Sequence, residues 1–340
     1  MSSSEFDLIR HYFMRPGAGR PDVVLGVGDD GAVLRPPAGK DLVAAIDTLV
    51  AGVHFPPDTD AESIGHKSLA VNLSDMAAMG AEPAWAMLAL TMPRADESWL
   101  EGFCRGFFAL ARAHDVALVG GDTTRGPLTV SVQIQGFIPP GAAFRRDGAR
   151  PGDLIYVTGT LGDAGLALLL VADEGIGHPG ERACLRRRLD RPLPRVREAL
   201  LLRGLVHAAI DVSDGLCADL GHVLAASGVG ATLHLERLPL SAEFRSCLDA
   251  MSAAGHAALR RFAPGLAWAD LALCAGDDYE LCFTVPPEHR ARLEDLAANG
   301  LPCSLIGVVE ADAGLRCRLE DGTLHQPARR GYDHFGADGR

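Results

Sequence analysis

The chain has 340 residues, of which 48% are hydrophobic, 22% charged and 6% aromatic, and its formal net charge is −12. This balance is typical of a globular protein with a full-sized core, and it excludes disordered and collagen-like chains. The length predicts about two domains at roughly 150 residues each. The negative charge disfavours binding to a polyanion, so we expect no nucleic-acid partner.

The hydropathy pattern does not indicate a membrane protein or a secreted protein. The first residues lack a basic stretch followed by an apolar one, and the apolar run 164–172 is bounded by Asp163 and Asp173. This run is too short to span a membrane. The eight cysteines form no C-x-x-C pair, and several lie in apolar runs where a reduced thiol packs as a small hydrophobe. We therefore expect a cytoplasmic protein with no membrane partner.

The first half of the chain alternates short apolar runs with helical patterns. Strands are predicted at 23–25, 42–46, 117–119 and 128–138, and helices at 62–79 and 97–113. The first three strands each lead into an acidic loop. The polar, turn-rich stretch 145–153 then marks a domain boundary. The predicted domains are residues 1–148 and 149–340.

The second half repeats the alternation of strands and helices. A strand at 154–158 is followed by a glycine loop and a helix at 164–172. Further strands are predicted at 208–210, 231–235, 280–285 and 304–309, with helices near 216–226 and 289–298. Both halves therefore belong to the α/β class.

Acidic residues gather in four glycine-containing clusters: Gly28-Asp29-Asp30-Gly31, Gly120-Gly121-Asp122-Thr123-Thr124, Asp211-Val212-Ser213-Asp214-Gly215 and Gly276-Asp277-Asp278-Tyr279-Glu280. A single aspartate in such a turn usually caps its own backbone. Several carboxylates that converge would repel one another unless hard cations lay between them, and Mg²⁺ prefers oxygen ligands while retaining water or substrate phosphate. Asp47 follows a strand, and Asp75 shares a helix face with Asn72. The pattern predicts magnesium ions and a phosphate substrate.

None of the glycine-rich segments fits a known phosphate loop. Gly26 to Gly31 matches G-x-G-x-x-G, but Pro36-Pro37 blocks a following helix and two aspartates would repel phosphate. Gly39-Lys40-Asp41 lacks the glycine spacing of a P-loop. The loop Gly159 to Gly165 joins a strand to a helix, and either anion binding or close packing explains its glycines. A kinase with a Walker-type loop is excluded.

The motif Asp211 to Asp214 also invites comparison with the haloacid-dehalogenase phosphatases. In those enzymes a nucleophilic aspartate follows a strand and a second aspartate lies two residues further on. Here the second acid lies three residues on. A covalent aspartyl-phosphate mechanism is therefore a low-ranked alternative.

Taken together, the motifs and their order resemble the thiamine-monophosphate kinases of the aminoimidazole-ribonucleotide-synthetase-like superfamily. The resemblance runs nearly end to end. The segments that carry it are Gly26-Val27-Gly28-Asp29-Asp30, Asp47 to Phe55, Ala70 to Ala81, Gly120 to Gly126, Asp211 to Leu216, Asp278-Tyr279-Glu280-Leu281 and Gly331-Tyr332-Asp333-His334-Phe335.

The resemblance implies a two-domain fold in which helices pack on mixed sheets, without a P-loop. It implies ATP-dependent phosphorylation of thiamine monophosphate to thiamine diphosphate, the last step of thiamine diphosphate biosynthesis, by a homodimer with several Mg²⁺ ions. The N-terminal domain would bind metal and ATP and form the dimer, and the C-terminal domain would complete the ATP and substrate site.

Site residues carry over from the family motifs position by position. The implied metal ligands are Asp30, Ala45, Ile46, Asp47, Asp75, Asp122, Asp211 and Asp214. The implied ATP contacts are Gly121, Asp122, Arg146 and Ser213, and the implied substrate contacts are His54, Asp277 and Tyr332. Ala45 and Ile46 stand where the family often has hydroxyl residues, so they offer only backbone carbonyls. No general base or covalent nucleophile is expected, because the attacking phosphate oxygen is already largely ionised near neutral pH.

Two further departures from the family pattern concern the ends of the site. Asp277 stands where glutamate is usual and Ala275 replaces a common glycine, which reshapes the substrate end. No aromatic adenine contact is evident, although Phe107 and Phe108 lie in the plausible region.

Two alternatives stay open beside the kinase. The first is an aminoimidazole-ribonucleotide-synthetase-like enzyme, although Asp47-Thr48-Leu49-Val50 lacks the Gly-Thr-Lys continuation expected there. The second is a non-catalytic nucleotide-sensing module that has kept the fold.

Overall fold

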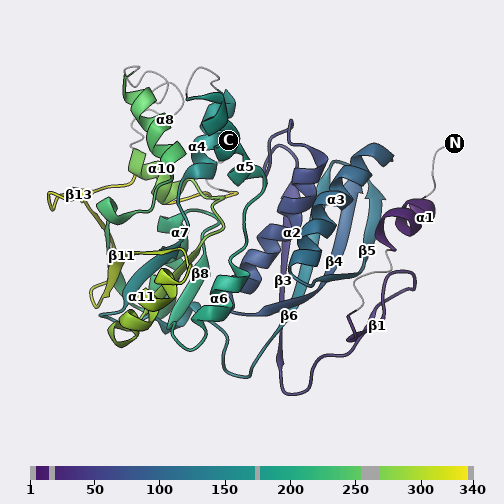
Figure 1. Ribbon diagram of the computed structural model, residues 1–340, viewed down its shortest axis with the longest axis horizontal. Helices are drawn as coiled ribbons and strands as arrows, with labels where there is room; N and C mark the ends of the chain where they lie inside the picture. Colours follow the sequence, from purple (N-terminus) through teal and green to yellow (C-terminus); the bar gives the residue numbers. More distant parts are fainter. Residues whose placement is uncertain (1–4, 15–19, 173–176, 254–267, 336–340) are drawn as a thin grey trace. The chain divides into compact units, whose positions relative to one another are not determined.

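The computed structural model describes residues 5–14, 20–172, 177–253 and 268–335. The chain divides into two compact units, Met1–Ala143 and Phe144–Arg340, each with its own sheet (Figure 1). This division lies a few residues before the boundary that the sequence predicts. Within the described residues, no helix is both long and apolar enough to cross a membrane.

The first unit is built on a four-stranded sheet in the order β3-β6-β4-β5, beside a small β1-β2 hairpin. β4 and β5 run parallel, whereas β6 pairs antiparallel with both β3 and β4, so the sheet is mixed. Its elements are α1 (Glu5–Leu8), η1 (Ile9–Phe13), β1 (Val23–Leu25), β2 (Val33–Leu34), β3 (Asp41–Val50), α2 (Ala61–Ala78), β4 (Glu82–Met92), α3 (Glu97–Ala113), β5 (Ala117–Arg125) and β6 (Thr129–Ile138).

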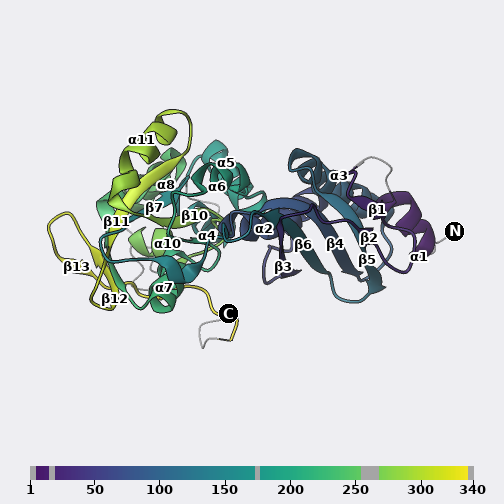
Figure 2. The same cartoon turned by 90° about the horizontal axis from the view of Figure 1, so that it is seen from below.

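Helices α2 and α3 lie side by side on one face of this sheet (Figures 1 and 2). Each begins at an aspartate whose side chain accepts a backbone hydrogen bond, Asp60 from Ser63 at 2.9 Å and Asp96 from Trp99 at 3.1 Å. Their contact depends on glycine, because a Cβ at Gly106 would lie 1.9 Å from the carbonyl oxygen of Glu62. The two backbones therefore approach more closely than any larger residue allows.

Alternation along the strands gives the sheet one buried face and one open face. Val130, Val132 and Ile134 of β6 are fully buried. On the edge strand β3, Leu42 is 50% exposed and Ile46 is 65% exposed. Residues that alternate along a strand point to opposite faces, so these two side chains belong to the face opposite the helices. The edge strand β3 therefore exposes apolar surface.

The second unit contains a seven-stranded sheet in the order β13-β12-β9-β11-β7-β10-β8, whose only parallel pair among the described strands is β12 with β9. Its strands are β7 (Leu154–Thr158), β8 (Ala208–Asp211), β9 (Gly230–His234), β10 (Leu281–Val285), β11 (Cys303–Glu310), β12 (Gly314–Arg318) and β13 (Leu324–His325). Its helices and helical turns are η2 (Arg146–Gly148), α4 (Asp163–Ala172), α5 (Pro179–Asp190), α6 (Val196–Leu202), α7 (Leu216–Ser227), η3 (Leu235–Arg237), α8 (Ala242–Ala253), α10 (Trp268–Cys274), η4 (Pro287–His289) and α11 (Arg290–Ala298).

The core of this unit forms where α7 and α10 pack on the sheet. Leu220 of α7 and Leu273 of α10 are fully buried together with Ile155, Ile210 and Leu233 of the strands. A second cluster joins α4, α5 and α8 through Leu166, Leu189 and Phe244. Both units therefore combine mixed sheets with packed helices, which confirms the predicted fold class.

Candidate active site

The loop after β8 carries the first group of predicted site residues in the second unit. β8 ends at Asp211, which is 6% exposed, and α7 begins after Gly215, whose φ of 114° favours glycine. The Asp219 carboxylate accepts hydrogen bonds from the backbone N–H of Asp214 at 3.0 Å and of Gly215 at 3.1 Å. Asp219 thus fixes the loop that presents Ser213 and Asp214. This role of Asp219 was not predicted from the sequence, because it depends on hydrogen bonds to backbone groups.

A tight turn places Asp277 against that loop. Gly276, Asp277 and Tyr279 have φ values of 75°, 61° and 49°, which is unfavourable for residues other than glycine. The backbone N–H of Asp277 donates to the carbonyl oxygen of Ser213 at 2.8 Å, and that of Tyr279 donates to Val212 at 2.8 Å. A predicted ATP contact and a predicted substrate contact are therefore neighbours.

The C-terminal segment reaches the same loop. The backbone N–H of Tyr332 donates to the carbonyl oxygen of Asp214 at 2.9 Å. The Tyr332 side chain is 44% exposed, and the ring of His334 meets it edge to face at a centroid distance of 4.9 Å. Ser213, Asp214, Asp277 and Tyr332 are thus brought together from three separate parts of the chain.

Negative charge accumulates at this loop. Burial, followed by the negative charges of Asp211 and Asp214, raises the pKa of Asp219 to about 8. Burial also raises the pKa of Asp214, while the positive charges of His334 and His222 oppose that shift. Carboxylate oxygens are the hard donors that a divalent cation such as Mg²⁺ prefers, and a bound cation would favour their charged forms.

In the first unit, α2 holds the strand that carries Asp47. The backbone N–H of Asp47 donates to Asn72 Oδ1 at 3.2 Å, and Asn72 Nδ2 donates to the Ser68 carbonyl oxygen at 3.0 Å. Asn72 is fully buried, and Asp75 lies one turn further along the same helix. The side chains of Ala45 and Ile46 have no oxygen, so only their backbone carbonyls could bind metal.

Asp30 and Asp122 lie in two other parts of the first unit. Asp30 is exposed in the loop between β1 and β2, where its backbone N–H donates to Asp29 Oδ1 at 2.9 Å. This loop leads to β2 and not to a helix, which confirms that Gly26 to Gly31 is not a dinucleotide-binding loop. Asp122 lies in β5 at the edge of a pocket.

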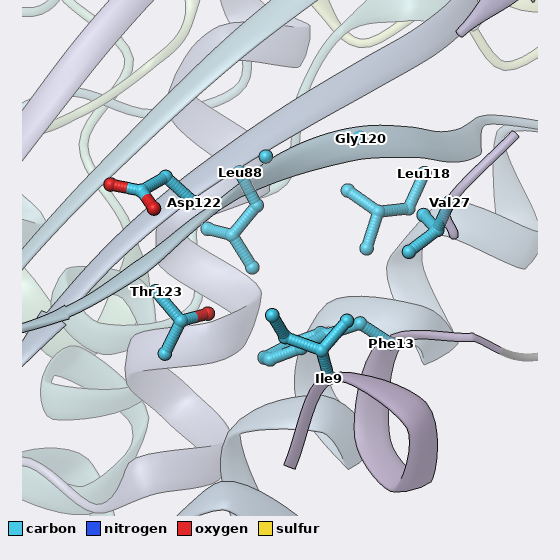
Figure 3. Close-up of a pocket in the computed structure, with 9 residues that line it drawn as sticks. Ile9, Phe13, Val27, Leu88, Leu118, Gly120, Asp122 and Thr123 are labelled. Carbon is cyan, nitrogen blue, oxygen red and sulfur yellow. The ribbon is translucent and has the colours of Figure 1, made fainter. Parts of the chain in front are cut away.

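The pocket spans about 310 Å³, a volume that includes space open to solvent (Figure 3). Its wall is mostly apolar and consists of Ile9, Phe13, Val27, Leu88, Leu118, Gly120, Gly121, Asp122 and Thr123. Figure 3 shows Thr123 of β5 and Leu88 of β4 directed toward the cavity and the Asp122 carboxylate directed away from it. At Gly121 a Cβ would lie 1.9 Å from the Leu88 carbonyl oxygen, so only glycine fits against β4 there.

Of the two aromatic residues considered for the adenine contact, Phe107 belongs to the core and Phe108 is half-buried. Phe107 is 1% exposed and stacks on Phe103 at 6.0 Å, and Phe108 meets Phe107 edge to face at 5.4 Å. Phe107 is therefore closed to a ligand by its packing.

His54 lies in the loop between β3 and α2. Its Nδ1 accepts a hydrogen bond from the backbone N–H of Val50 at 3.0 Å, and its carbonyl oxygen accepts one from Lys67 Nζ at 3.0 Å. Lys67 is 1% exposed, so this loop is tied to α2 by a buried ammonium group. That role of Lys67 was not predicted from the sequence.

Arg146 lies in η2 at the start of the second unit and is exposed. Its carbonyl oxygen accepts a hydrogen bond from Ser227 Oγ at 2.9 Å, which ties the turn to the end of α7. The neighbouring Arg145 pairs with Asp147 at 2.5 Å. The turn is thus held by its backbone while the Arg146 side chain faces solvent.

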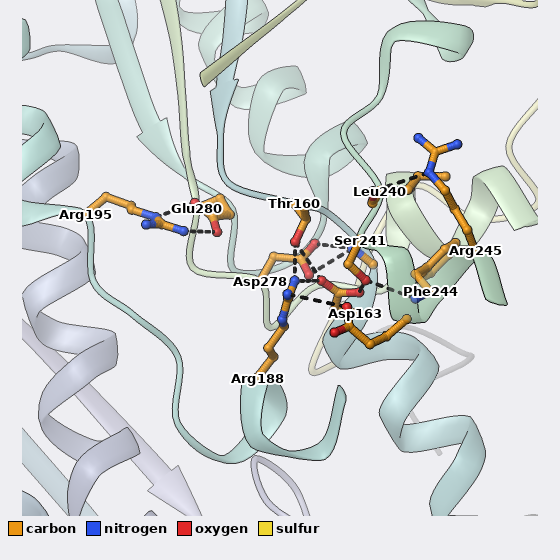
Figure 4. Close-up of polar contacts among 12 residues, drawn as sticks. Thr160, Asp163, Arg188, Arg195, Leu240, Ser241, Phe244, Arg245, Asp278 and Glu280 are labelled. Carbon is orange, nitrogen blue, oxygen red and sulfur yellow. Dashed lines mark hydrogen bonds and ion pairs between the residues drawn. The ribbon is translucent and has the colours of Figure 1, made fainter. Parts of the chain in front are cut away.

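The glycine loop between β7 and α4 is explained by packing. The backbone N–H groups of Gly159 and Leu161 donate to the carbonyl oxygens of Pro302 and Pro239, and that of Gly162 donates to the Asp278 carboxylate (Figure 4). At Gly162 a Cβ would meet Ala272 Cα at 2.9 Å. These amides are already bound within the protein, so close packing and not anion binding accounts for the glycines.

The predicted metal ligands are thus distributed over both units. Asp30, Asp47, Asp75 and Asp122 belong to the first unit, and Asp211 and Asp214 belong to the second. Across the described ranges, no group of three or more His, Cys, Asp or Glu side chains is arranged to hold a metal ion. Assignment of these residues as ligands stays a prediction.

Both units match models of known protein families. Residues 28–138 match the N-terminal domain of AIR synthase related protein, and residues 150–320 match its C-terminal domain. The fold and the acid-rich loops without a P-loop define a member of this class, and the chain belongs to it.

Within that class, the chain belongs to the thiamine-monophosphate kinase family. It is 47% identical over 339 residues to the thiamine-monophosphate kinase of Escherichia coli (strain K12), covering 98% of this chain and 99% of that protein. The corresponding protein of Haemophilus influenzae is 39% identical over 341 residues, with 98% and 99% covered. The resemblance predicted from the sequence motifs is confirmed.

Solved structures agree with this assignment. Thiamine-monophosphate kinase from Stenotrophomonas maltophilia K279a superposes with a TM-score of 0.83 at 47% identity, covering 96% of this chain and 99% of that one. AaThiL complexed with AMPPCP and TMP superposes with a TM-score of 0.74 at 31% identity, covering 88% and 89%. Hydrogenase maturation protein HypE, at 20% identity and a TM-score of 0.72, shares the fold alone.

Proposed function

We propose that the chain is an enzyme that transfers the γ-phosphoryl group of ATP to the phosphate of thiamine monophosphate, forming thiamine diphosphate and ADP. The observation that carries this proposal is the convergence of Ser213, Asp214, Asp277 and Tyr332 in a chain of this family. A structural relative binds AMPPCP and TMP, which supports both substrates.

The predicted contacts with the two reactants come from residues of both units. Asp277 would accept a hydrogen bond from the pyrimidine amino group, and Tyr332 would stack on the aromatic rings. His54 is the third predicted substrate contact. Gly121, Asp122, Arg146 and Ser213 would bind ATP, and the apolar pocket beside Gly121 offers a wall of the right character for the base.

The chemistry requires charge neutralisation and not a strong base. The attacking phosphate oxygen is already ionised, so in-line transfer depends on positioning two anions together. Asp30, Asp47, Asp75, Asp122, Asp211 and Asp214, with the carbonyls of Ala45 and Ile46, would hold Mg²⁺, which supplies electrostatic stabilisation of the phosphoryl oxygens when bound. The Arg146 guanidinium would add positive charge near the ATP phosphates.

The open face of the first sheet supports a homodimer. β3 is an edge strand of 10 residues, and Leu42 and Ile46 expose apolar surface on it. Long apolar edge strands usually associate with another strand unless they are covered. We infer that a second copy of the chain covers this face. None of the eight cysteines, all of which lie in the described ranges, forms a disulfide bond, which supports a cytoplasmic location.

Purified protein with ATP, Mg²⁺ and thiamine monophosphate, with and without EDTA, tests the activity. Chromatography should show thiamine diphosphate and ADP in equal amounts, and EDTA should abolish both. ADP without thiamine diphosphate would mean that the acceptor is wrong. Neither product would favour a non-catalytic nucleotide-binding protein.

A further inference from the structure

The turn that carries Asp277 contains the two non-glycine residues with left-handed backbone among the described residues of the second unit. Asp277 and Tyr279 both adopt left-handed backbone conformations without being glycine. Such conformations persist only where the surrounding structure holds them, and they concentrate at functional sites. The neighbouring residues Asp278 and Glu280 are therefore candidates for holding this turn in place.

Asp278 anchors the turn to the loop that follows β7. Both of its carboxylate oxygens lie within hydrogen-bond distance of the Gly162 backbone nitrogen, at 2.9 and 3.0 Å (Figure 4). Burial of the carboxyl, together with the nearby acids Asp163, Glu280 and Asp277, raises its pKa well above the ordinary value, and the Gly162 hydrogen bond opposes that shift. An acid is thus kept at a position that disfavours negative charge.

Glu280 anchors the other end of the turn. Its carboxylate forms a two-point ion pair with Arg195, with both N–O distances at 2.6 Å, and accepts a hydrogen bond from Thr158 Oγ1 at 2.6 Å. The same Thr158 hydroxyl oxygen accepts the backbone N–H of Leu281 at 2.8 Å. A residue larger than glycine at position 159 would collide with this carboxylate, because its Cβ would lie 1.9 Å from Glu280 Oε1. The ion pair is therefore built into the start of β10.

We propose that Asp278 and Glu280 are positioning residues that hold the strained turn so that Asp277 faces the substrate beside Ser213. Neither side chain touches the substrate in this proposal. Its basis is that both anchors flank the strained residue, while the backbone of Asp277 and Tyr279 is pinned to Ser213 and Val212. The inference rests on the proposed function, because it assigns Asp277 to thiamine monophosphate.

The test compares Asp278→Ala with Asp278→Asn. Alanine removes the acceptor for Gly162, whereas asparagine keeps one oxygen that can accept the same hydrogen bond. We expect Asp278→Ala to raise the KM for thiamine monophosphate about tenfold, with the KM for ATP unchanged, and Asp278→Asn to stay within about threefold of wild type. Because alanine could prevent folding, Arg195→Lys is a second variant that keeps the charge but loses the two-point geometry.

Arg186→Ala is the matched control. It breaks another ion pair of 2.6 Å, with Asp190 within α5. The dissociation constant of thiamine monophosphate, measured by calorimetry with Mg²⁺ and AMPPCP, gives a readout independent of turnover. Wild-type protein that fails to bind thiamine monophosphate would overturn the proposed function. The positioning role would be overturned if the wild type binds thiamine monophosphate and the folded Asp278→Ala and Arg195→Lys proteins bind it equally well. It would also be overturned if these variants lose affinity for ATP to the same degree as for thiamine monophosphate.

Discussion

The backbone N–H of Tyr332 donates to the carbonyl oxygen of Asp214 at 2.9 Å, which fixes an exposed aromatic ring beside an acid-rich loop. The ring itself is 44% exposed and contacts His334 edge to face. A backbone anchor with an exposed ring is the arrangement expected of a side chain that stacks on a ligand.

Replacing this ring should weaken substrate binding. Tyr332→Ala should raise the KM for thiamine monophosphate about three- to tenfold, because an aromatic stacking contact contributes about 0.5–1.5 kcal/mol beyond its buried area. Tyr332→Phe keeps the ring and should stay near wild type. Steady-state kinetics measures both variants, and equal values for alanine and phenylalanine would show that the ring does not contact the substrate.

Removing one carboxylate from either unit should abolish metal-dependent turnover without unfolding the protein. We expect Asp75→Asn and Asp211→Asn each to lower kcat by at least about a hundredfold, because each would remove charge that holds the reacting phosphates. Asp295→Asn, an exposed acid on α11, is the control. Titration of activity with Mg²⁺, with circular dichroism to check folding, is the measurement. Full activity in either site variant would remove that residue from the ligand set.

A charge on the open face of β3 should separate the proposed dimer. Ile46→Lys places an ammonium group where a 65% exposed apolar side chain now lies, so the variant should elute as a monomer. Leu193→Lys, at a 64% exposed apolar position in the second unit, should leave the oligomeric state unchanged. Light scattering after size-exclusion chromatography gives the mass. An Ile46→Lys protein with the mass of the wild type would place the interface elsewhere.

Acid should weaken the first unit through Asp22. Hydrogen bonds from Arg20 lower the pKa of this carboxyl, whereas burial opposes the shift. A hydrogen bond of 3.1 Å from Trp85 Nε1 lowers the pKa further. Because the folded pKa lies below the unfolded one, the stabilisation is complete above the unfolded pKa of about 4 and is lost as the pH falls through the folded pKa. Asp22→Asn should therefore lower the free energy of unfolding at pH 7, and its difference from wild type should shrink between about pH 4 and pH 2.

Urea denaturation at several pH values measures that difference. Asp295→Asn should show no comparable trend, since this acid is exposed. A constant difference between Asp22→Asn and wild type across the range would show that the carboxylate charge is not what stabilises the unit.

The sequence predicted most of the strands and several helices where their apolar periods are long and regular, as in α3 and β6, but it missed the central strand β4 and the core helix α10. It singled out Asp211, Asp214 and Asp277 because acids in glycine-rich turns are unusual in series, and their role in the site stays a prediction. It could not decide between anion binding and packing for the Gly159 loop, because that depends on Pro302, Pro239 and Asp278, which lie far away in sequence. The roles of Asp219 and Lys67 were missed for a related reason. Each acts by donating to or accepting from a backbone group, and backbone geometry leaves no residue-type pattern.

The long separations also set an order of folding. Asp214, Asp277 and Tyr332 become neighbours only after β8 and β10 have paired and the C-terminal segment has returned to the start of α7. Contacts between distant parts of a chain form late, since the intervening chain must first be ordered. Catalytic competence should therefore be among the last properties to emerge on refolding, after the spectroscopic signal of both sheets has been recovered.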